Sequence, residues 1–402
     1  MNILVVNCGS YSIKYQLIES NEEKVLAKGI VDRIGMSGAI LNHTRYDGDT
    51  IKLSGEILDH SIAIEYVLAV LISKNHGVLK DKNEIDAIGH RVVHGGEDFA
   101  GSVFITPEVM KALRDNIELA PLHNPHNIRG IEACKQHLPD TPQVGVFDTA
   151  FHQTMEPYAY LYGIPYVLYR RYKIRRYGFH GTSHFFVSLR AALLMNKPID
   201  TLRIITCHLG NGCSMAAIRN GQSIDTSMGF TPLEGLLMGT RSGDLDPSLI
   251  LYVMAKEELT LSEANTLLNK HSGLMGVSGE NSDMREIVQA MKRGDEKSKN
   301  AFNIFCYRVK KYIGAYAASL GGADCIVFTG GIGENSAEVR SAVCSQLEFL
   351  GIKLDQQANL DGQKERAITT QDSTTKVFVI PTNEELVIAQ DTARIVDEMK
   401  MK

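Results

Sequence analysis

Two short turns rich in glycine and hydroxyl groups are the segments of this chain best suited to chemistry. Residues 7–12 read NCGSYS and residues 208–214 read HLGNGCS, and each turn lies between two apolar segments that read as strands. Such turns present backbone N–H groups and serine hydroxyls to an anion. One turn of this kind is a weak signal, because most Gly/Ser hairpin turns hold no ligand. Two of them in similar contexts, with Lys14 just beyond the first, predict two similar halves that hold one polyphosphate.

Arg91 and Arg241 are the arginines best placed to bind an oxyanion. A guanidinium group is planar and always charged, and it can bind two oxygens of a carboxylate or phosphate at once. A lone arginine more often forms a surface ion pair. Glycines at 95 and 96, and at 239 and 243, stand close to these arginines and leave room for a ligand. We therefore interpret both arginines as anion-binding residues.

Two further polar sites follow predicted strands, where α/β proteins usually place their ligands. Asp148 follows the strand VGVF, and the turn Gly330–Asn335 follows the strand CIVFT. This third turn has neither lysine nor serine among its glycines, which favours close approach of a flat group such as adenine or ribose. The alternative is a strand-to-helix turn that needs positive φ. His180, in the segment GFHGTSH, is a further candidate.

The histidine-rich segments do not suit structural zinc. His90 and His94 are four residues apart, but their segment reads as a strand, where such positions do not converge as on a helix. A Mg²⁺ ion held by one or two carboxylates and by nucleotide phosphates fits better. The candidate ligands are Asn7, Asp148 and Glu384. The alternative role for Glu384 is to complement the dipole at the start of a helix.

The composition is that of a soluble globular protein large enough for two domains. The chain has 402 residues, of which 44% are hydrophobic and 22% are charged. A net charge of −5 argues against a nucleic-acid partner, and no apolar run is long enough to span a membrane. Seven scattered cysteines without a CxxC motif predict a reduced, cytoplasmic protein. The basic, aromatic segment 169–177 is too short and isolated to change this interpretation.

Short apolar strands alternate with amphipathic helices along the chain, which predicts an α/β fold. We expect one domain from residues 1–150 and 385–402, and a second domain from residues 151–384. Thr382 and Glu385 are the candidates for a capping box at the start of the last helix. The expected strands are 2–7, 12–18, 85–93, 143–147, 203–208, 213–218, 324–329 and 376–380. The expected helices are 56–73, 107–116, 125–137, 182–195, 232–238, 246–257, 261–270, 283–292, 296–320, 336–349 and 383–399.

A series of motifs along the chain carries a resemblance to one known family: NCGSYSIK, GHRVVHGG, PLHNP, VFDTAFH, RRYGFHGTSH, HLGNG, DTSMGFTPLEGLLMGTRSGDLDP, FTGGIGENS and PTNEEL. Together, and in this order, they resemble the acetate kinase family, and the long block is highly specific. The resemblance implies the actin-like ATPase fold, with two duplicated, ribonuclease-H-like α/β domains around a central cleft. It also implies a homodimer that forms through the second domain, which would bind the nucleotide.

The resemblance also assigns roles residue by residue. Catalytic roles fall on Arg91, His123, Asp148, His180 and Arg241. Arg91 would also bind the substrate, and the pocket for the acetate methyl group falls on Val93, Leu122, Phe179 and Pro232. The metal, Mg²⁺ with Mn²⁺ as an alternative, would lie at Asn7 and Glu384. Contacts to ATP or ADP fall on Ser10, Ser12, Lys14, His208, Leu209, Gly210, Asn211, Gly212, Asp283, Met284, Arg285, Gly331, Ile332, Gly333, Glu334 and Asn335.

The implied reaction is reversible, Mg-dependent transfer of a phosphoryl group from ATP to acetate by direct in-line displacement. Acetate is already ionised at neutral pH, so no general base is required. We therefore expect Asp148 to orient Arg91 or a metal-bound water. Propionate or butyrate stays open as the substrate, because one methylene is worth only ~1–3 kcal/mol in a pocket. A non-catalytic nucleotide switch is less favoured, since a switch needs no second cationic site.

Two positions depart from the family pattern. Tyr11 stands in the first turn where the family usually has serine, and Gly330 stands where alanine is more frequent. The tyrosine would either point away from the phosphates or narrow access to them. Neither position is charged or catalytic, so we expect the activity to be retained.

Overall fold

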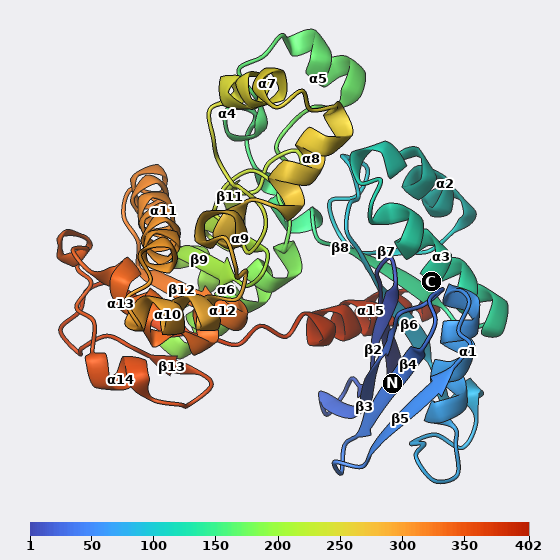
Figure 1. Ribbon diagram of the computed structural model, residues 1–402. Helices are drawn as coiled ribbons and strands as arrows, with labels where there is room; N and C mark the ends of the chain where they lie inside the picture. Colours follow the sequence, from blue (N-terminus) through green and yellow to red (C-terminus); the bar gives the residue numbers. More distant parts are fainter. Residues whose placement is uncertain (402) are drawn as a thin grey trace. The chain divides into compact units, whose positions relative to one another are not determined.

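The computed structural model describes residues 1–401, which divide into two compact units. Unit 1 comprises residues 1–151 and the segment that begins at Asn383, and unit 2 comprises His152–Thr382. Each unit is built around a mixed β-sheet with helices, so the predicted α/β class is confirmed (Figure 1). Within residues 1–401, no helix has both the length and the apolar composition needed to cross a membrane.

The sheet of unit 1 has eight strands in the order β5-β4-β3-β2-β1-β6-β8-β7. β1 and β2 form an antiparallel hairpin, and β6 and then β8 extend the sheet from β1 as parallel strands. Most of β1 is buried valine, leucine and isoleucine, as expected of a central strand covered on both faces. The strands are β1 Asn2–Cys8, β2 Ser12–Glu19, β3 Lys24–Asp32, β4 Ala39–Arg45, β5 Thr50–Gly55, β6 Ala87–Val92, β7 Val103–Phe104 and β8 Gln143–Phe147.

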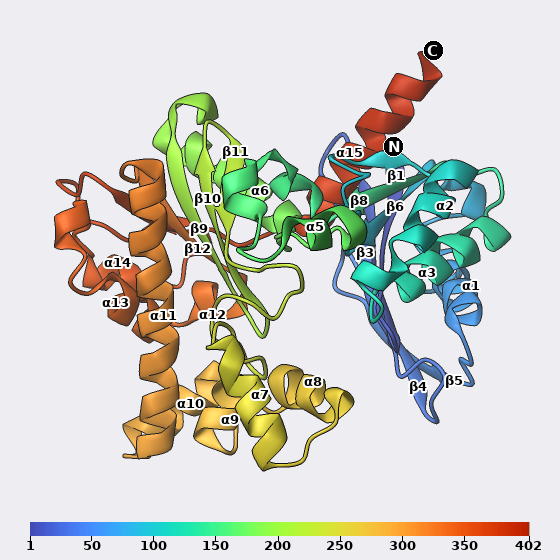
Figure 2. The same cartoon turned by 90° about the horizontal axis from the view of Figure 1, so that it is seen from above.

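Helices cover both faces of this sheet. α1 and α3 pack on the face that carries Leu4 and Val6, and α15 packs on the face that carries Ile3 and Val5 (Figures 1 and 2). The two faces follow from the two-residue period of a strand. The helices of unit 1 are α1 His60–Leu71, α2 Pro107–Asp115, α3 Asn124–His137 and α15 Glu384–Lys400.

The sheet of unit 2 has six strands in the order β11-β10-β9-β12-β14-β13. Its centre repeats that of unit 1, because the antiparallel hairpin of β9 and β10 is extended by the parallel strands β12 and β14. Outside the hairpins, β11 takes the place that β3 has in unit 1. This shared strand order confirms the two similar halves predicted from the repeated turn. The strands are β9 Arg203–Leu209, β10 Cys213–Arg219, β11 Gln222–Thr226, β12 Cys325–Thr329, β13 Arg366–Ala367 and β14 Lys376–Val379.

Two longer helices, α6 and α11, pack on β9 and β10, and the sheet lies between them in Figure 2. α11 buries an apolar stripe along its length and ends at Gly321, which adopts φ +71 as a C-cap. The helices of unit 2 are α4 Pro157–Tyr160, α5 Tyr166–Tyr172, α6 Gly181–Met195, α7 Pro247–Lys256, α8 Leu261–Lys270, α9 Gly273–Ser278, α10 Met284–Lys292, α11 Glu296–Leu320, α12 Gly330–Asn335, α13 Ala337–Cys344 and α14 Gln356–Leu360.

Two expectations about local structure are wrong. Residues 232–238 form no helix, because Gly235 has φ +108 and its N–H donates to the Asp244 carboxylate rather than to a helical carbonyl. The capping box is absent at the start of α15, where Asn383 is the N-cap and accepts from the backbone N–H of Leu386. An asparagine caps a helix at least as well as a threonine, so the helix begins one residue later than predicted.

Acidification should destabilise the protein, partly through His90 in β6. Its side chain is buried, and burial lowers its pKa to about 4. With its amide turned by 180°, Gln143 donates to His90 Nε2 at 2.7 Å, which also favours the neutral ring. An unfolded histidine takes up a proton near pH 6.5. Between that pH and about 4 the unfolded state therefore binds more protons, and stability falls as the pH falls.

We expect His90 to contribute about 1.4 kcal/mol per pH unit to this loss. Replacement of His90 with leucine should reduce the pH dependence of the unfolding free energy by that amount. Urea unfolding at pH 4.5, 5.5 and 6.5 measures it. The exposed His271, replaced in the same way, is the control and should leave the slope unchanged. Equal slopes for wild type and His90→Leu would contradict the assignment.

Candidate functional site

The first Gly/Ser turn joins β1 to β2 in unit 1. The N–H of Gly9 donates to Ser12 O at 2.8 Å, and His60 Nε2 lies 2.8 Å from Gly9 O. In the register of the hairpin Asn7 lies opposite Lys14, so both side chains project from the same face. The turn therefore presents an amide and an ammonium group side by side at its base.

The tip of this turn is formed by Ser10 and Tyr11. Tyr11 is 58% exposed, so its ring does not close the turn. Both residues border a hollow of about 550 Å³, to which His60, His126 and Arg129 also contribute. The Tyr11 departure thus leaves the backbone of the turn accessible.

Arg91, near the end of β6, forms the central ion pair of unit 1. Its Nε and Nη2 donate to the two carboxylate oxygens of Asp148 at 2.9 and 2.7 Å, and Glu384 Oε2 lies 3.6 Å from Nε. Asp148 follows β8 and is only 2% exposed. Because β6 and β8 are adjacent parallel strands, their carboxyl ends bring the two residues together, which is one of the two roles expected of Asp148 from the sequence.

Negative charge is in excess around this arginine. Burial alone would lower the pKa of Arg91, but Asp148 and then Glu384 raise it above its usual value. Burial raises the pKa of Glu384, and the charges of Asp148 and Glu385 add to this effect, whereas Arg91 opposes it. Three carboxyl groups thus share one guanidinium group, an environment that a divalent cation would stabilise.

A cavity of about 310 Å³ brings several predicted site residues of unit 1 together. Asn7, Lys14, Arg91 and Glu384 all line it. Both candidate metal ligands therefore face one space, beside a lysine and an arginine that could bind phosphate oxygens. Within residues 1–401, no group of three or more His, Cys, Asp or Glu side chains forms a ready-made metal site. A metal held here would need phosphate and water ligands, as Mg²⁺ commonly does.

The predicted pocket residues of unit 1 lie around the end of β6 and the start of α3. β6 ends at Val92, so the alternation of the strand does not extend to Val93, which is half-buried in the following turn. Leu122 is 66% exposed, and His123 is the N-cap residue of α3. Leu122 is therefore accessible, and a bound ligand would have to cover it if it belongs to the acyl pocket.

Two buried asparagines in α3 connect these segments, and sequence reasoning missed both. Asn127 Nδ2 donates to Cys8 O at 2.9 Å, and its Oδ1 accepts from Val93 N at 3.0 Å. Asn124 bonds both backbone groups of His94, at 3.2 and 3.0 Å. α3 thereby ties the first turn to the end of β6. The available signal was that asparagine is unfavourable inside a helix, which indicates a tertiary role without naming it.

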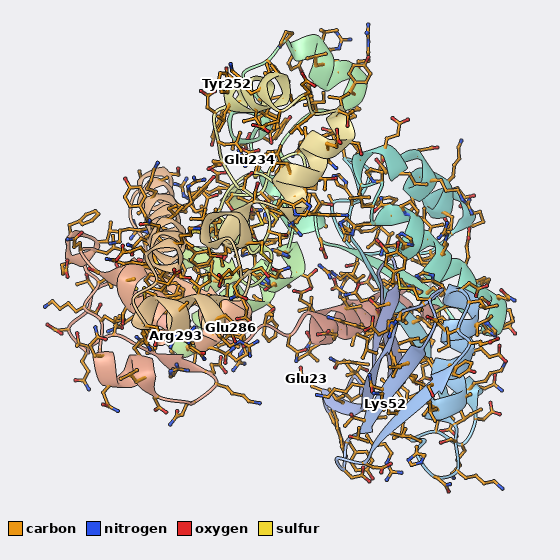
Figure 3. The ribbon with its side chains drawn as sticks, in the orientation of Figure 1. Glu23, Lys52, Glu234, Tyr252, Glu286 and Arg293 are labelled. Carbon is orange, nitrogen blue, oxygen red and sulfur yellow. The ribbon has the colours of Figure 1, made fainter. Side chains whose placement is uncertain are left out.

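The second Gly/Ser turn joins β9 to β10 in unit 2 and borders a cavity of about 830 Å³. This volume suits a ligand of nucleotide size. The predicted nucleotide residues that line it come from three separate segments: Gly210, Asn211, Asp283, Met284, Arg285, Gly331, Ile332 and Asn335. The lining residues that sequence reasoning missed are Ser282, Val288, Gln289, Lys292, Ser336 and Glu338. Figure 3 labels Glu286 and Arg293 on and beside α10, the helix that provides several of them.

Other predicted nucleotide residues support this cavity rather than line it. Leu209 and Gly333 are buried. Glu334 turns back and accepts from the N–H of Gly330 at 2.9 Å. His208 Nδ1 lies 2.8 Å from the Ser183 hydroxyl. The third Gly-rich turn, Gly330–Asn335, is thus the short helix α12, which follows β12 directly and begins at Gly330 with φ +77, as in the strand-to-helix alternative considered from the sequence.

Arg241 and His180 approach each other around Gly212 in unit 2. A Cβ atom on Gly212 would lie 3.6 Å from Arg241 Nη1 and 3.7 Å from His180 Nε2, so one small anion could contact both side chains. Arg241 Nη1 donates to Pro232 O at 3.0 Å. Burial lowers the pKa of Arg241, and no carboxylate within residues 1–401 forms an ion pair with it. A partly buried guanidinium group without a counter-ion is well suited to bind an anion.

His180 itself has an unusual backbone conformation. It is the N-cap of α6 with φ +55, in the left-handed region that non-glycine residues rarely occupy. Such conformations cost free energy and concentrate at functional sites. The preceding residue, Phe179, is 3% exposed, and its carbonyl oxygen lies 3.1 Å from His152 Nε2.

A long loop, residues 227–246, positions Pro232 and Arg241 without regular secondary structure. Arg176 is its main support: Nη1 donates to the carbonyl oxygens of residues 226, 227 and 228 at 3.0, 3.2 and 3.2 Å. Its Nη2 donates to Glu234, labelled in Figure 3, at 2.5 Å. The basic segment that contains Arg176 is therefore structural in part, a role that sequence reasoning missed.

The same loop docks against the second Gly/Ser turn. The N–H of Gly239 donates to Asn211 O at 3.0 Å. A Cβ atom at Gly239 would lie 1.9 Å from Asn211 Oδ1, so any side chain here would displace the Asn211 amide. The nucleotide cavity and the Arg241 anion site are thus joined through Asn211.

Comparison with known proteins gives a consistent result. Residues 2–390 match the model of the acetokinase family. The acetate kinase of Thermoanaerobacterium thermosaccharolyticum is 59% identical over 401 residues and is covered completely, as is this chain. The crystal structure of Porphyromonas gingivalis acetate kinase superposes with a TM-score of 0.95 at 49% identity and covers 98% of this chain and 99% of its own. A propionate kinase from Francisella tularensis matches with a TM-score of 0.91 at 43% identity, over 98% and 99% of the two chains.

Proposed function

From the premise that this chain belongs to the acetokinase family, with the actin-like ATPase fold of that family, we propose that it catalyses ATP + acetate ⇌ ADP + acetyl phosphate. The observation that carries most weight is Arg241, a partly buried guanidinium group with no carboxylate partner within residues 1–401, beside a nucleotide-sized cavity. An anion would complete that site, and a transferring phosphoryl group is such an anion.

The nucleotide would bind in the cavity of unit 2. The backbone of residues 208–212 would contact phosphate oxygens, and α10 and α12 would enclose the adenosine. Arg285 stands at the edge of the cavity, where Asp283 pairs with it at 2.6 Å. The family's ATP requirement is therefore supported by a preformed pocket of the right size.

Mg²⁺, or Mn²⁺ in its place, would bind beside Asn7 and Glu384. The excess of carboxylate around Arg91 supports this assignment, because a cation near Glu384 would offset the mutual repulsion of three acidic groups. Ser10, Ser12 and Lys14 would contact phosphate oxygens. When bound, the metal would neutralise charge on the phosphates.

Catalysis would depend on alignment and charge rather than on proton transfer. Acetate attacks as a carboxylate, so no base is needed. Arg91 and Arg241 would stabilise the negative charge of the transferring group, with His180 and His123 as further donors. Asp148 already has both oxygens on Arg91, which supports a role in orienting that arginine rather than in accepting a proton.

A coupled assay of ADP formation with acetate, propionate and butyrate tests the proposal. We expect Mg-dependent turnover with the highest kcat/KM for acetate. Higher kcat/KM for propionate would favour the second candidate, a propionate kinase, which the structural match to the Francisella tularensis enzyme keeps in consideration. Nucleotide binding without turnover of any of the three acids would leave only the nucleotide-switch alternative.

Replacement of Val93 with alanine should shift the preference from acetate toward propionate by about tenfold in relative kcat/KM, since one methylene is worth ~1–3 kcal/mol. Val93 lies just beyond the end of β6, two residues after Arg91, and Asn127 fixes its backbone, so the smaller side chain leaves space without moving the chain. The matched control is Val109→Ala in α2. An unchanged propionate-to-acetate ratio would place Val93 outside the acyl pocket.

The homodimer would form through unit 2. Large apolar side chains are exposed on α4, α5 and α7, which all lie at the upper end of this unit in Figure 1. Leu251 is 68% exposed and Tyr252, labelled in Figure 3, is 61% exposed. Exposed apolar patches of this kind mark protein interfaces. The protein would work in the cytoplasm, in keeping with seven free, buried cysteines.

Replacement of Leu251 with glutamate should convert the dimer to a monomer, because the charge would have to be desolvated at the interface. Light scattering after size-exclusion chromatography measures the mass. The control is Leu360→Glu on α14, where a leucine of similar exposure, 67%, lies on another part of unit 2. A Leu251→Glu variant with unchanged dimer mass would put the interface elsewhere.

A further inference from the structure

A fully buried chain of hydrogen bonds lies behind His180 in unit 2. His180 Nδ1 is 2.9 Å from the hydroxyl of Ser214 on β10. The same hydroxyl is 2.7 Å from Nε2 of His184 on α6, and His184 Nδ1 is 2.7 Å from the hydroxyl of Thr206 on β9. Ser214, His184 and Thr206 are each 0% exposed. These side chains are therefore isolated from solvent, so each of their donor protons must find its acceptor within this chain of hydrogen bonds.

The hydroxyl of Ser214 has one proton and two imidazole nitrogens as partners. It can donate to only one of them, so the other nitrogen must carry a proton and donate to the serine. Either His180 Nδ1 is bare and His184 Nε2 is protonated, or the reverse holds. The charge of His184 and its hydrogen bond to Thr206 show which of these two states is present.

His184 is neutral and therefore has a single N–H. Burial, with smaller effects from the neighbouring His152 and His208, holds its pKa well below the usual value. If that proton were on Nδ1, it would point at Thr206 Oγ1, and the threonine proton would need another acceptor. Within residues 1–401, the Thr206 hydroxyl has no second hydrogen-bond partner. An orphaned buried hydroxyl proton is unfavourable, so Thr206 donates to Nδ1 and the proton of His184 lies on Nε2.

We propose that Ser214 is a positioning residue that, with His184 and Thr206, holds His180 as a neutral imidazole with its proton on Nε2. The chain then runs in one direction: Thr206 donates to His184, His184 to Ser214, and Ser214 to His180 Nδ1. With a proton on His180 Nδ1, either the Ser214 proton or the Thr206 proton would be left without an acceptor. The catalytic consequence rests on the proposed function, but the tautomer does not.

Arg241, His208 and His152 act in the same sense. Arg241 Nη1 and His180 Nε2 lie 3.6 and 3.7 Å from the position of a Cβ atom on Gly212, so the guanidinium group is close to the His180 ring. The ring of His208 stacks on that of His180 at 4.2 Å between centroids, with Ser183 on its Nδ1. His152 packs edge-on against His184 at 5.7 Å. None of these groups carries a negative charge that would favour an imidazolium ion at His180.

The arrangement defines what His180 can do in the reaction. A neutral imidazole with its proton on Nε2 donates one hydrogen bond to a phosphoryl or acyl oxygen, and it keeps this donor when the pH changes within the neutral range. Arg241 then supplies the positive charge, and His180 supplies an oriented hydrogen bond that positions the oxygen. This differs from an imidazolium ion that neutralises phosphate charge, because such an ion would be lost above its pKa.

Two-bond ¹H–¹⁵N correlation spectra of [¹⁵N]histidine-labelled protein at pH 7 test the tautomer directly. His180→Gln identifies the His180 signals by their loss. We expect a bare Nδ1 and a protonated Nε2 in the wild type between pH 6 and 8. A protonated Nδ1 in this range, as the other tautomer or as an imidazolium ion, would overturn the proposal without any variant of Ser214.

Ser214→Ala should then release His180, giving mixed tautomers and an imidazolium signal that grows toward pH 6. Ser223→Ala is the matched control, since it removes a buried hydroxyl 2.8 Å from Nδ1 of a different histidine, His152, and should leave the His180 signals unchanged. Ser214→Thr keeps the hydroxyl and should keep the wild-type tautomer. Wild-type His180 signals in Ser214→Ala would contradict the role of the serine.

In the kinase assay, Ser214→Ala should lower kcat about tenfold at pH 6 and less at pH 8, a dependence that a purely structural defect would not produce. A protein that turns over none of the three acids but shows the expected His180 spectra would refute the proposed function and leave the tautomer assignment standing. Normal turnover together with a protonated Nδ1 on His180 would support the proposed function and refute the tautomer assignment.

Discussion

Replacement of Arg241 with methionine should lower kcat by about 10²–10³-fold while the free energy of unfolding stays the same or rises. Arg241 is partly buried, burial lowers its pKa, and its Nη1 bonds only Pro232 O and Met238 Sδ within residues 1–401. Its charge therefore destabilises the free protein and becomes useful when an anion arrives. Methionine has a similar length and no charge, so it should pack in the same space.

Steady-state kinetics and urea unfolding of the same preparation measure both effects. Arg241→Lys is the companion variant: it keeps the charge but lacks the planar pair of donors, and should recover only part of the activity. A methionine variant that unfolds much more easily than the wild type would show that Arg241 is structural. Near wild-type kcat would show that it does not contact the transferring group.

Replacement of Arg91 with alanine should also lower kcat by about 10²–10³-fold, but here the protein should lose about 3–5 kcal/mol of stability. Arg91 bonds both oxygens of Asp148, which is 2% exposed, and lies 3.6 Å from Glu384. Its removal leaves Asp148 buried without a counter-ion. The two arginines should therefore have similar effects on catalysis and opposite effects on stability.

The double variant Arg91→Ala, Asp148→Asn separates these effects. Asp148→Asn removes the buried charge that lost its partner. It should restore most of the stability and none of the activity, as measured by urea unfolding and the coupled assay. Full stability in the single variant Arg91→Ala would show that Asp148 does not depend on the ion pair. Restored activity in the double variant would remove Arg91 from the proposed mechanism.

The parts of the fold that the sequence predicts well are those where local pattern and tertiary need agree. The hairpins of β1 with β2 and β9 with β10 have apolar strands and a turn within a short segment, so their pairing could be read directly. Arg91 and Asp148 could each be placed at a strand end from the sequence, and the adjacent parallel strands β6 and β8 bring those ends together. Strands β3, β4 and β5 were not predicted, since many of their residues are only partly buried and their apolar periodicity is weak.

The parts of the site that escaped prediction depend on contacts between segments distant in sequence. Asn127 is defined by bonds to Cys8 and Val93, neither of which is near it in the chain. The loop 227–246 reads partly as a helix, and only the guanidinium of Arg176 and the carboxylate of Asp244 explain why it is not. Sequence patterns reveal the periodic apolar residues of helices and strands, and single polar side chains that bond distant segments leave no such pattern.

The position of α15 has a consequence for synthesis on the ribosome. α15 completes the apolar core of unit 1, where Ile388 and Val396 pack with Val5 and Val144 from the first part of the chain. While the chain is being made, that face of the sheet has nothing to cover it until residues 383–401 emerge. Unit 2 is continuous and has all its strands and helices once Thr382 has left the ribosome. The usual order of co-translational folding is therefore reversed: unit 1, most of which is made first, keeps an exposed apolar face until α15, which is made after unit 2, has emerged.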